Sequence, residues 1–352
     1  MLSVALRHAF EGFSLDVAFE APEGVTALFG PSGSGKTSIL RAVAGLMEPD
    51  EARIQVGGQD LSALPPEARG VGFVFQDARL FPHLSVAENL RFGQRLRGQT
   101  ADIDQIVALL DLENLLERRP RGLSGGEAQR VAIGRALLSA PRILCMDEPL
   151  ASLDALRKSR ILPYLERVTQ ALDLPVLYVT HDIAEVARLA NTLVFLQEGR
   201  ITRAGPLDEM MIDPGTVAEL GLREAGAVLT LKVRSHDATQ GLTLLEGAAL
   251  RLTVPGIKAP AGEKVRVRIA AQDIILATQR PEALSALNIF ECVVRRIVPD
   301  GAGRVGVTLQ VGDADLLARI TQVSVNKLPL APGVRVFAIV KAAAFDPEGM
   351  RG

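Results

Sequence analysis

The feature that most constrains the fold of this chain is a glycine-rich segment, residues 30–37, with the sequence GPSGSGKT. It fits the pattern G-x-x-x-x-G-K-[ST] in full, and it lies between an apolar run at residues 25–29 and a helical pattern at residues 36–46. A glycine loop between a strand and a helix directs several backbone N–H groups at a phosphate chain, an approach that larger side chains would block. The segment therefore predicts a P-loop α/β fold that binds a nucleotide through Gly30, Pro31, Ser32, Gly33, Ser34, Gly35, Lys36, Thr37 and Ser38.

A second strand-like run, residues 142–146, ends in a pair of carboxylates that complements this loop. We expect Lys36 to reach the β- and γ-phosphates of ATP, and the Thr37 hydroxyl to bind Mg²⁺. Asp147 stands where it would join the Mg²⁺ ligands, and Glu148 where it would polarise an attacking water. An Asp-Glu-Pro sequence is also common at the end of a strand without any catalytic role. The pair indicates catalysis here because the chain also contains a complete phosphate loop.

Residues 123–127, LSGGE, open a helix in a way that permits two interpretations. Ser124 and Glu127 have the spacing of a capping box, S-x-x-E. The same helix start, with Gly125 and Gly126 leaving its N–H groups bare, is also an anion site. That anion site cannot reach the phosphate of its own chain's loop if the loop is filled from the other side. We therefore expect a homodimer in which two copies share two ATP sites.

Composition excludes several classes of protein. The 39 basic and 41 acidic side chains give a net charge of -2, which leaves no overall field to attract nucleic acid. Residues 227–352 hold no Tyr or Trp and only three Phe, a poor set of stacking platforms for single strands. No run approaches the roughly 18 to 20 apolar residues that span a bilayer, and the first ten residues do not have the pattern of a secretory signal. We therefore expect no nucleic-acid partner.

The pattern of apolar residues changes near residue 225. Before it, short apolar runs alternate with helical stretches, which predicts an α/β domain on a mostly parallel sheet over residues 1–225, with a helical insertion at about 86–140. After it, short strands separated by turn residues predict an all-β, OB-like small barrel over 226–352. Gly262 and Gly333 are each followed by apolar residues at the same three offsets, which indicates two tandem barrels or a coincidence in strand-rich sequence.

Taken together, the motifs of residues 1–225 resemble the ATP-binding cassette ATPases. The resemblance implies that residues 30–37 are the Walker A loop, that residues 123–127 are the signature sequence, and that Asp147 and Glu148 are the Walker B aspartate and catalytic glutamate. It also implies that Gln76 touches Mg²⁺ and the attacking water, that Asp154 lies in a loop crossing the dimer interface, and that His181 contacts the γ-phosphate. Under this resemblance the Mg²⁺ ligands are Thr37, Gln76 and Asp147.

Two departures from the family pattern affect details of this site. The signature has Glu127 where glutamine is commoner. The aromatic residue that stacks on adenine is not obvious upstream of the glycine loop, and His8, Phe10 and Phe13 are all candidates.

Three further stretches point to a substrate. Residues 64–67 and 72–83, above all DARLFPH at 77–83, closely resemble the molybdate importer ATPases. The third, which comprises residues 285–289, 320–325 and 340–342, resembles the molybdate-binding Mop type of small barrel, over about 285–346. A tetrahedral dianion is bound by hydroxyls, N–H groups and cations. Molybdate or tungstate would then be bound, in one chain or across a dimer, by Ser285, Asn288, Arg319, Thr321, Ser324 and Lys341, each of which is equally well explained as a polar surface or strand-end residue.

The resemblance implies an ATPase that energises molybdate or tungstate import from the cytoplasmic face of the membrane. Its partners would be an integral-membrane permease, docked near Leu80, Phe81 and Leu84, and indirectly a periplasmic or extracellular oxyanion-binding protein. An importer ATPase for sulfate, iron, a sugar or a polyamine remains an alternative. A soluble cassette ATPase acting on DNA or ribosomes, or a non-catalytic oxyanion sensor, is a third possibility. The soluble cassette ATPase lacks support because the sequence has neither a long coiled-coil insertion nor a second cassette. The non-catalytic sensor is disfavoured because Lys36, Glu148 and His181 are all intact.

Overall fold

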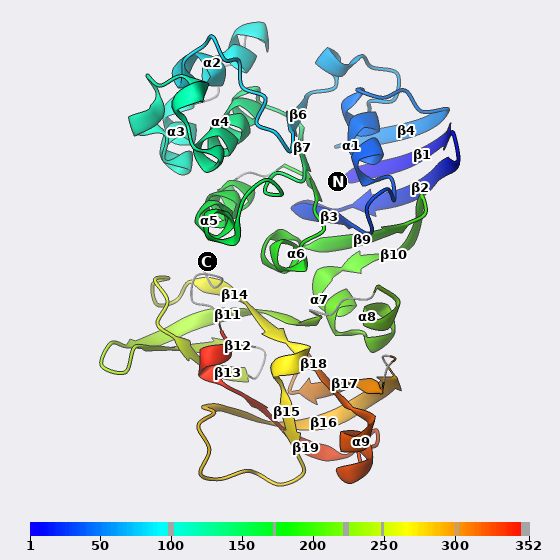
Figure 1. The fold of residues 1–352 in the computed structure, drawn as a ribbon, viewed down its shortest axis with the longest axis vertical. Helices are drawn as coiled ribbons and strands as arrows, with labels where there is room; N and C mark the ends of the chain where they lie inside the picture. The colour runs from blue at the N-terminus through cyan, green and yellow to red at the C-terminus, as the bar shows by residue number, and fades with distance from the viewer. Residues whose placement is uncertain are drawn as a thin grey trace. The chain divides into compact units, whose positions relative to one another are not determined.

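The computed structural model describes residues 1–97, 102–171, 174–220, 225–247, 250–299, 301 and 303–345 (Figure 1). Contacts divide the chain into two compact units, Met1–Gly205 and Pro206–Gly352. Helices α7 (Leu207–Ile212) and α8 (Pro214–Leu220) therefore group with the C-terminal strands, so this division falls earlier than the boundary proposed at residue 225. Parts of the segments predicted from sequence, residues 98–101, 221–224 and 346, lie outside the described residues.

A ten-stranded mixed sheet forms the first unit, in the order β5-β4-β1-β2-β10-β9-β3-β8-β7-β6. The strands are β1 (Leu2–Phe10), β2 (Phe13–Ala21), β3 (Val25–Phe29), β4 (Glu51–Val56), β5 (Gln59–Asp60), β6 (Val71–Val74), β7 (Ile143–Asp147), β8 (Val176–Val179), β9 (Thr192–Gln197) and β10 (Arg200–Pro206). Parallel pairing joins β6 to β7, β7 to β8, β8 to β3 and β3 to β9. The carboxyl ends of β3, β7 and β8 consequently meet at one edge, where ligands of open α/β sheets bind.

The helices of this unit are α1 (Lys36–Ala44), α2 (Val86–Arg97), α3 (Ile103–Leu110), α4 (Gly125–Leu138), α5 (Ala155–Ala171) and α6 (Ile183–Leu189). Three of them, α2 to α4, lie in the stretch at about 86–140 where the sequence predicts a helical insertion. Helix α4 packs against both α2 and α3, and Figure 1 shows the three grouped together. Among the described residues, no helix combines the length and apolar character needed to cross a bilayer.

The first two strands were not identified from the sequence, although a signal for one of them is present. In β2 the side chains alternate strictly between exposed and buried, with Leu15, Val17 and Phe19 buried. That period of two is typical of a strand with one face in the core. Strand β1 pairs antiparallel with β2 and β4, so this part of the sheet is antiparallel.

The C-terminal unit is all-β apart from short helices. Its two sheets have the orders β13-β12-β11-β14 and β15-β19-β16-β17-β18. The elements are β11 (Gly226–Asp237), β12 (Leu242–Gly247), β13 (Leu250–Pro255), β14 (Lys264–Ala270), β15 (Ile275–Ala277), β16 (Asn288–Pro299), β17 (Arg304–Val311), β18 (Ala314–Thr321), α9 (Gln322–Lys327) and β19 (Arg335–Val340). Buried residues of both sheets form one hydrophobic cluster, so the unit has a shared core.

The two sheets are structural repeats of one another. Strands β14-β11-β12-β13 and β19-β16-β17-β18 have the same order and the same antiparallel pairing. Each long strand has an irregularity at the equivalent place, after Val233 in β11 and after Val294 in β16. The backbone N–H of Gly262 donates to Val233 O and that of Gly333 to Val294 O, both at 2.8 Å. The repeated spacing in the sequence therefore corresponds to a tandem repeat in the structure.

Candidate functional site

The phosphate loop follows β3 and leads into α1, as expected from its sequence. Gly30 has a φ of +153°, and a Cβ at this position would lie 2.0 Å from the carbonyl oxygen of Leu196. Gly35, at the N-cap of α1, has a φ of +102°. Only glycine adopts these conformations and tolerates that approach without strain. The loop conformation therefore depends on its glycines.

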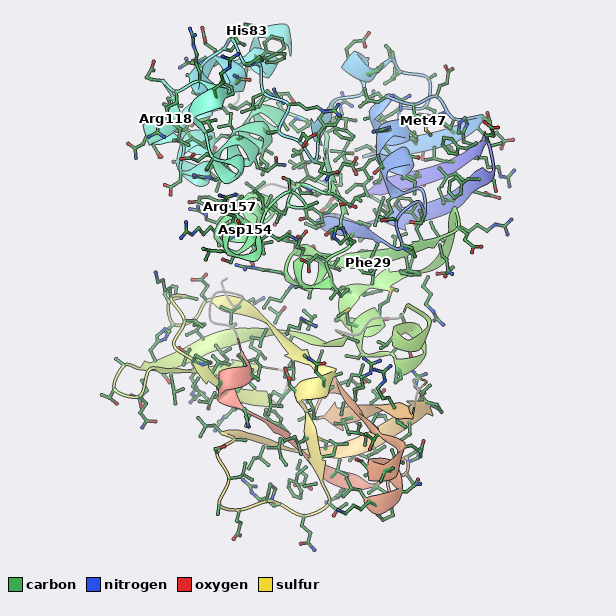
Figure 2. The ribbon with its side chains drawn as sticks, viewed as in Figure 1. Phe29, Met47, His83, Arg118, Asp154 and Arg157 are labelled. Carbon is green, nitrogen blue, oxygen red and sulfur yellow. The ribbon has the colours of Figure 1, made fainter. Side chains whose placement is uncertain are left out.

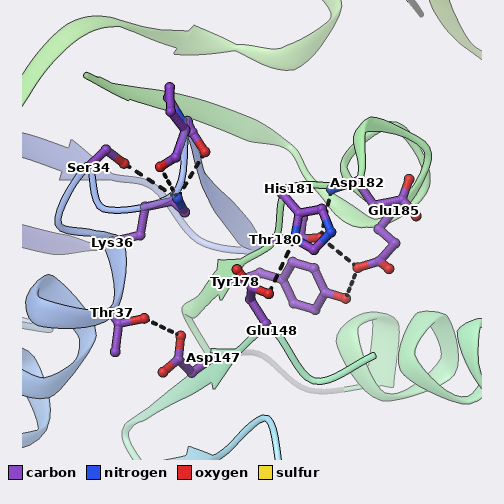
Figure 3. A network of polar contacts seen from close by, with 12 residues as sticks. Ser34, Lys36, Thr37, Asp147, Glu148, Tyr178, Thr180, His181, Asp182 and Glu185 are labelled. Carbon is purple, nitrogen blue, oxygen red and sulfur yellow. Dashed lines mark hydrogen bonds and ion pairs between the residues drawn. The ribbon is translucent and has the colours of Figure 1, made fainter. Parts of the chain in front are cut away.

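Lys36 is a buried cation held over this loop (Figure 3). Its Nζ donates to the carbonyl oxygens of Gly30 at 2.9 Å and Pro31 at 2.7 Å, and the residue is 6% exposed. Burial lowers the pKa of the Lys36 ammonium, whereas the carboxylates of Glu148 and Asp147 act to raise it. The ammonium is therefore fixed at the loop, where the approach of a phosphate would compensate its burial.

Thr37 and Asp147 supply two adjacent oxygens at the carboxyl edge of the sheet. The Thr37 hydroxyl donates to Asp147 Oδ1 at 2.8 Å. Burial raises the pKa of the Asp147 carboxyl, while the Thr37 hydrogen bond acts to lower it. Gln76 is exposed and follows β6, the parallel neighbour of the strand that ends in Asp147. Hydroxyl, carboxylate and amide oxygens are suitable Mg²⁺ ligands beside bound phosphates, so this set fits the ion.

Glu148 and His181 lie together at the ends of β7 and β8. Glu148 Oε2 is 3.2 Å from His181 Nδ1, and the two side chains are 25% and 60% exposed. Glu148 has a φ of +44°, an uncommon conformation for a residue other than glycine, and its N–H donates to Val179 O at 3.0 Å. Strain of this kind concentrates at functional sites. The structure thus brings the expected water-polarising carboxylate and the histidine into contact.

The signature segment is a complete capping box at the start of α4. Ser124 Oγ accepts from the Glu127 N–H at 3.3 Å, and Glu127 Oε2 accepts from the Ser124 N–H at 2.7 Å. The hydrogen bond from the Ser124 backbone lowers the pKa of the Glu127 carboxyl. A Cβ on Gly126 would lie 3.0 Å from Ile161 Cδ1, so that glycine allows α4 to pack closely on α5; Gly125 is the first residue of α4.

Asp154 directly precedes α5 and caps its start. Its Oδ1 accepts from the Arg157 N–H at 2.9 Å, as an N-cap residue does. Asp154 and Arg157 also form an ion pair at 3.4 Å (Figure 2). Both side chains are more than half exposed, so they are accessible to a second copy of the chain.

Sequence reasoning missed Gln129, which anchors the loop containing Gln76. Gln129 lies on α4, is 3% exposed, and donates through Nε2 to the carbonyl oxygen of Phe75 at 3.2 Å. On the same helix Arg135 donates to the carbonyl oxygens of Ala78 and Arg79. A buried amide on an otherwise apolar helix face was the available signal.

Of the aromatic candidates for stacking on adenine, Phe13 lies beside the loop. Its Cζ is 3.3 Å from the position of a Cβ built on Gly35. Phe10 packs on Phe13 with ring centroids 5.8 Å apart, and His8 lies edge-on to Phe10 at 4.3 Å.

The candidate oxyanion residues fall into two groups within one chain. Asn288 begins β16 and pairs with Val340, next to Lys341; Ser285 precedes it. At the far end of β16, Pro299 pairs with Val305, in the stretch of β17 where Arg304 pairs with Thr321. Arg319, Thr321 and Ser324 therefore lie at the other end of this sheet. One chain does not bring all six residues together.

Two of these residues have structural roles. Asn288 is 2% exposed; its Oδ1 accepts from the Thr253 N–H at 2.7 Å and its Nδ2 donates to Thr253 O at 2.9 Å. Both faces of this amide are thus used to join β16 to β13. Thr321 caps α9 by accepting from the Ser324 N–H at 3.1 Å, and its hydroxyl lies 2.9 Å from that of Ser324.

Comparison with known proteins extends over nearly the whole chain. The sequence profile described as ABC transporter matches residues 14–151, and that of the TOBE domain matches residues 284–345, the second of the two repeats. The molybdenum import ATP-binding protein ModC of Rhizobium johnstonii is 47% identical over 98% of this chain and 99% of its own length. The protein of the same name from Paramagnetospirillum magneticum is 46% identical over 97% of both chains.

Solved structures confirm the fold of the first unit. A dimeric ATP-binding cassette in a post-hydrolysis state, bound to ADP and Pi, is 26% identical with a TM-score of 0.51 over 59% of this chain and 99% of that chain. A nucleotide-free cassette from an ABC transporter, 24% identical with a TM-score of 0.54, covers 62% of this chain and 94% of its own. The predicted fold class, a P-loop cassette followed by an all-β domain, is confirmed, and the cassette is a nucleotide-binding fold. The chain belongs to the ATP-binding subunits of ABC transporters, in the family of molybdenum import ATP-binding proteins.

Proposed function

We propose that this chain hydrolyses ATP to energise the import of molybdate through a membrane permease. The observation that carries the reaction is the meeting of Lys36, the Thr37–Asp147 pair and the Glu148–His181 pair at one edge of the sheet. The assignment of molybdate as the substrate rests on the near-full-length similarity to proteins named for molybdenum import and on the DARLFPH segment at residues 77–83.

In this mechanism the chain mainly positions and neutralises phosphates. The loop N–H groups and Lys36 would bind the phosphate chain, and Thr37, Asp147 and Gln76 would hold Mg²⁺, which neutralises phosphate charge when it is bound with ATP. Glu148 would accept the proton of the attacking water at its carboxylate. His181, in contact with Glu148, would donate to the γ-phosphate.

The reaction requires a second copy of the chain. Within its own chain, Ser124 accepts through Oγ from the Glu127 N–H and donates through its own N–H to Glu127. Gly125 and Gly126, the first two residues of α4, have no side chains that would cover the helix start. We propose that this helix start binds the γ-phosphate held by the partner copy, with Asp154 at the seam between them. The similarity to a dimeric cassette supports this arrangement.

Permease binding is assigned to the segment after Gln76. The backbone of Phe81 is held by Asn89, whose Oδ1 accepts from the Phe81 N–H at 2.8 Å and whose Nδ2 donates to Phe81 O at 3.1 Å. The Phe81 ring packs on Phe92, which is 37% exposed. This ordered, partly apolar surface would dock a permease loop and would place the chain on the cytoplasmic face of the membrane, with the oxyanion-binding protein on the opposite side.

We also propose that molybdate or tungstate binds the C-terminal unit, with the two groups of candidate residues supplied by different copies. Ser285 and Lys341 from one end of β16 would then meet Arg319, Thr321 and Ser324 from another chain. Calorimetric titration of the full chain with molybdate, tungstate and sulfate tests this site. Heat for molybdate or tungstate but not sulfate is expected, and preference for sulfate would contradict it.

Uptake measurements in the source organism test the main proposal. Cells whose copy of this chain carries Glu148→Gln should lose high-affinity molybdate uptake and keep sulfate uptake, which is the matched control. If these cells lose sulfate uptake but keep molybdate uptake, the assignment of molybdate as the substrate is wrong, while the proposed ATPase function still stands. Absence of ATP hydrolysis by the purified wild-type protein, with and without molybdate, would overturn the function itself.

A further inference from the structure

A buried polar network lies directly behind His181 and has no part in the mechanism above. Its centre is Glu185 on α6, which is 2% exposed. Glu185 accepts from the Tyr178 hydroxyl at 2.7 Å and from the Thr180 hydroxyl at 2.8 Å (Figure 3). It also accepts from Lys158 Nζ at 2.8 Å. A buried carboxylate is costly unless it is paired and hydrogen-bonded, and these three donors satisfy it.

The network fixes both residues that flank His181 in the sequence. Thr180 donates to Glu185 and accepts from the Asp182 N–H at 3.0 Å. Asp182 accepts from Lys158 Nζ at 3.1 Å through one oxygen and from the Ala184 N–H at 3.0 Å through the other. The His181 side chain, in contrast, is 60% exposed and lies against Glu148. The position of His181 is therefore set by its neighbours rather than by burial of its own ring.

Lys158 extends the network to the Asp154 loop. It lies on α5, one turn after Asp154, and its backbone N–H donates to Asp154 O at 2.9 Å. Burial acts to lower the pKa of the Lys158 ammonium, but the hydrogen bonds and charges of Glu185 and Asp182 outweigh it and raise the pKa. Burial, together with the Glu185 charge, raises the pKa of Tyr178 well above its ordinary value, so the phenol stays a donor.

We propose that Glu185 is a positioning residue that, through Thr180 and Asp182, holds His181 against Glu148 and, through Lys158, couples His181 to the Asp154 loop. This proposal rests on the ATPase function proposed above. A shift of α5 when a second copy contacts the Asp154 loop would move Lys158, and with it the backbone on both sides of His181. The histidine would then reach its working position only when the dimer seam has formed.

A second ion pair between the same two helices supplies a matched control. Glu166 on α5 pairs with Arg188 on α6, with Arg188 Nη2 2.9 Å from Glu166 Oε2. Their side chains are 7% and 9% exposed, so this pair, like Glu185 itself, is buried. It lies farther along both helices and does not include the residues flanking His181. Breaking it should cost stability without moving His181.

The first test compares Glu185→Gln with Glu166→Gln in the full-length protein. Because small displacements of catalytic groups are costly, Glu185→Gln should lower kcat for ATP about 10- to 100-fold. The KM for ATP should change little, since the phosphate loop is untouched. Glu166→Gln should lower the melting temperature to a similar extent and leave kcat near the wild-type value. Equal effects of the two substitutions on kcat would overturn the proposal.

A double-mutant cycle separates positioning from a general structural role. If Glu185 acts through His181, adding Glu185→Gln to His181→Ala should cause almost no further loss of kcat. If the double variant instead shows the product of the two single losses of kcat, Glu185 acts independently of His181 and the proposal is overturned. If Glu185→Gln fails to fold, Tyr178→Phe can replace it, because this substitution removes one donor from the network. Tyr178→Phe should lower kcat by a smaller factor, and its combination with His181→Ala should again cause almost no further loss.

Hydrogen exchange gives a readout that does not need ATP hydrolysis. In the nucleotide-free protein, Glu185→Gln should speed exchange of the Asp182 and Ala184 amides, whereas Glu166→Gln should not. Unchanged exchange at these amides would overturn the positioning role even in a protein with full ATPase activity. If the wild-type protein has no ATPase activity but Glu185→Gln still speeds exchange at these amides, only the proposed ATPase function is overturned and the positioning role stands.

Discussion

The two units of this chain use their functional candidates in opposite ways. In the first unit, residues from distant parts of the sequence meet at the ends of adjacent parallel strands, where Thr37 contacts Asp147 and Glu148 contacts His181. In the C-terminal unit, the candidate residues are divided between the two ends of β16, and Asn288 is committed to joining strands. Parallel strands gather the residues that follow them at one edge, whereas a repeated antiparallel barrel spreads them. An oxyanion site that uses residues from both groups would therefore need a second chain.

The largest effect is expected from Glu148→Gln, which tests the first half of this comparison. Removing a well-placed catalytic group commonly costs about 100- to 1,000-fold in rate, so ATP hydrolysis should nearly cease. ATP binding should persist, because the loop and Lys36 are unchanged, and the protein should accumulate as a dimer with trapped nucleotide. ATPase assays and size-exclusion chromatography with ATP measure both results. Near-normal turnover would remove Glu148 from its role.

Ser124→Arg should be nearly as damaging, and its control lies in the same unit. Ser85 forms an equivalent capping box with Glu88, in which its Oγ accepts at 3.2 Å and its N–H donates at 2.7 Å. Both Ser124→Arg and Ser85→Arg lose a cap, worth about 1 kcal/mol of stability. Only Ser124→Arg should also lower the rate of hydrolysis, by about 100-fold, because in the proposed dimer only the start of α4 contacts the partner's nucleotide. Equal ATPase activities of the two variants would refute the shared site.

In the C-terminal unit, Asn288→Ala should act on stability rather than on chemistry. The substitution leaves the N–H and C=O of Thr253 without their partner, which costs about 1–3 kcal/mol per unsatisfied buried group. ATPase activity should be unchanged. Lys341→Ala, at an exposed position beside it, should leave stability unchanged and weaken any oxyanion binding. Thermal unfolding and oxyanion calorimetry on both variants distinguish the roles, and an unchanged melting temperature in Asn288→Ala would contradict the clamp.

The smallest effect concerns Asp147 and the pH. Burial raises the pKa of its carboxyl, so the folded state holds this proton more tightly than the unfolded state. Stability is then lost as the pH rises from the ordinary aspartate range through the raised pKa. Asp147→Asn should therefore raise the melting temperature of the magnesium-free protein at neutral pH, and the gain should vanish in acid. A gain that persists in acid would assign the effect to another cause.

The cassette was readable from sequence because its chemistry lies in contiguous motifs. The loop at residues 30–37 and the strand end at Asp147 each contain their own structural signal, and β3 has the predicted bounds. Gln129 and the Glu185 network were not identified, because a buried polar side chain shows its partners only after the chain has folded. The division of the oxyanion candidates depends on which end of β16 each strand reaches, and short motifs do not contain that information.

The shared core of the two repeats limits how the C-terminal unit can be exchanged between proteins. Val267 of the first repeat and Val307 of the second belong to the same buried cluster, together with residues from the strands beside them. The segment matched as a TOBE domain, residues 284–345, therefore shares its buried core with the first repeat. A chimera joined near residue 284 would pair unmatched apolar surfaces, whereas one joined before α7 would carry the whole packing arrangement with it.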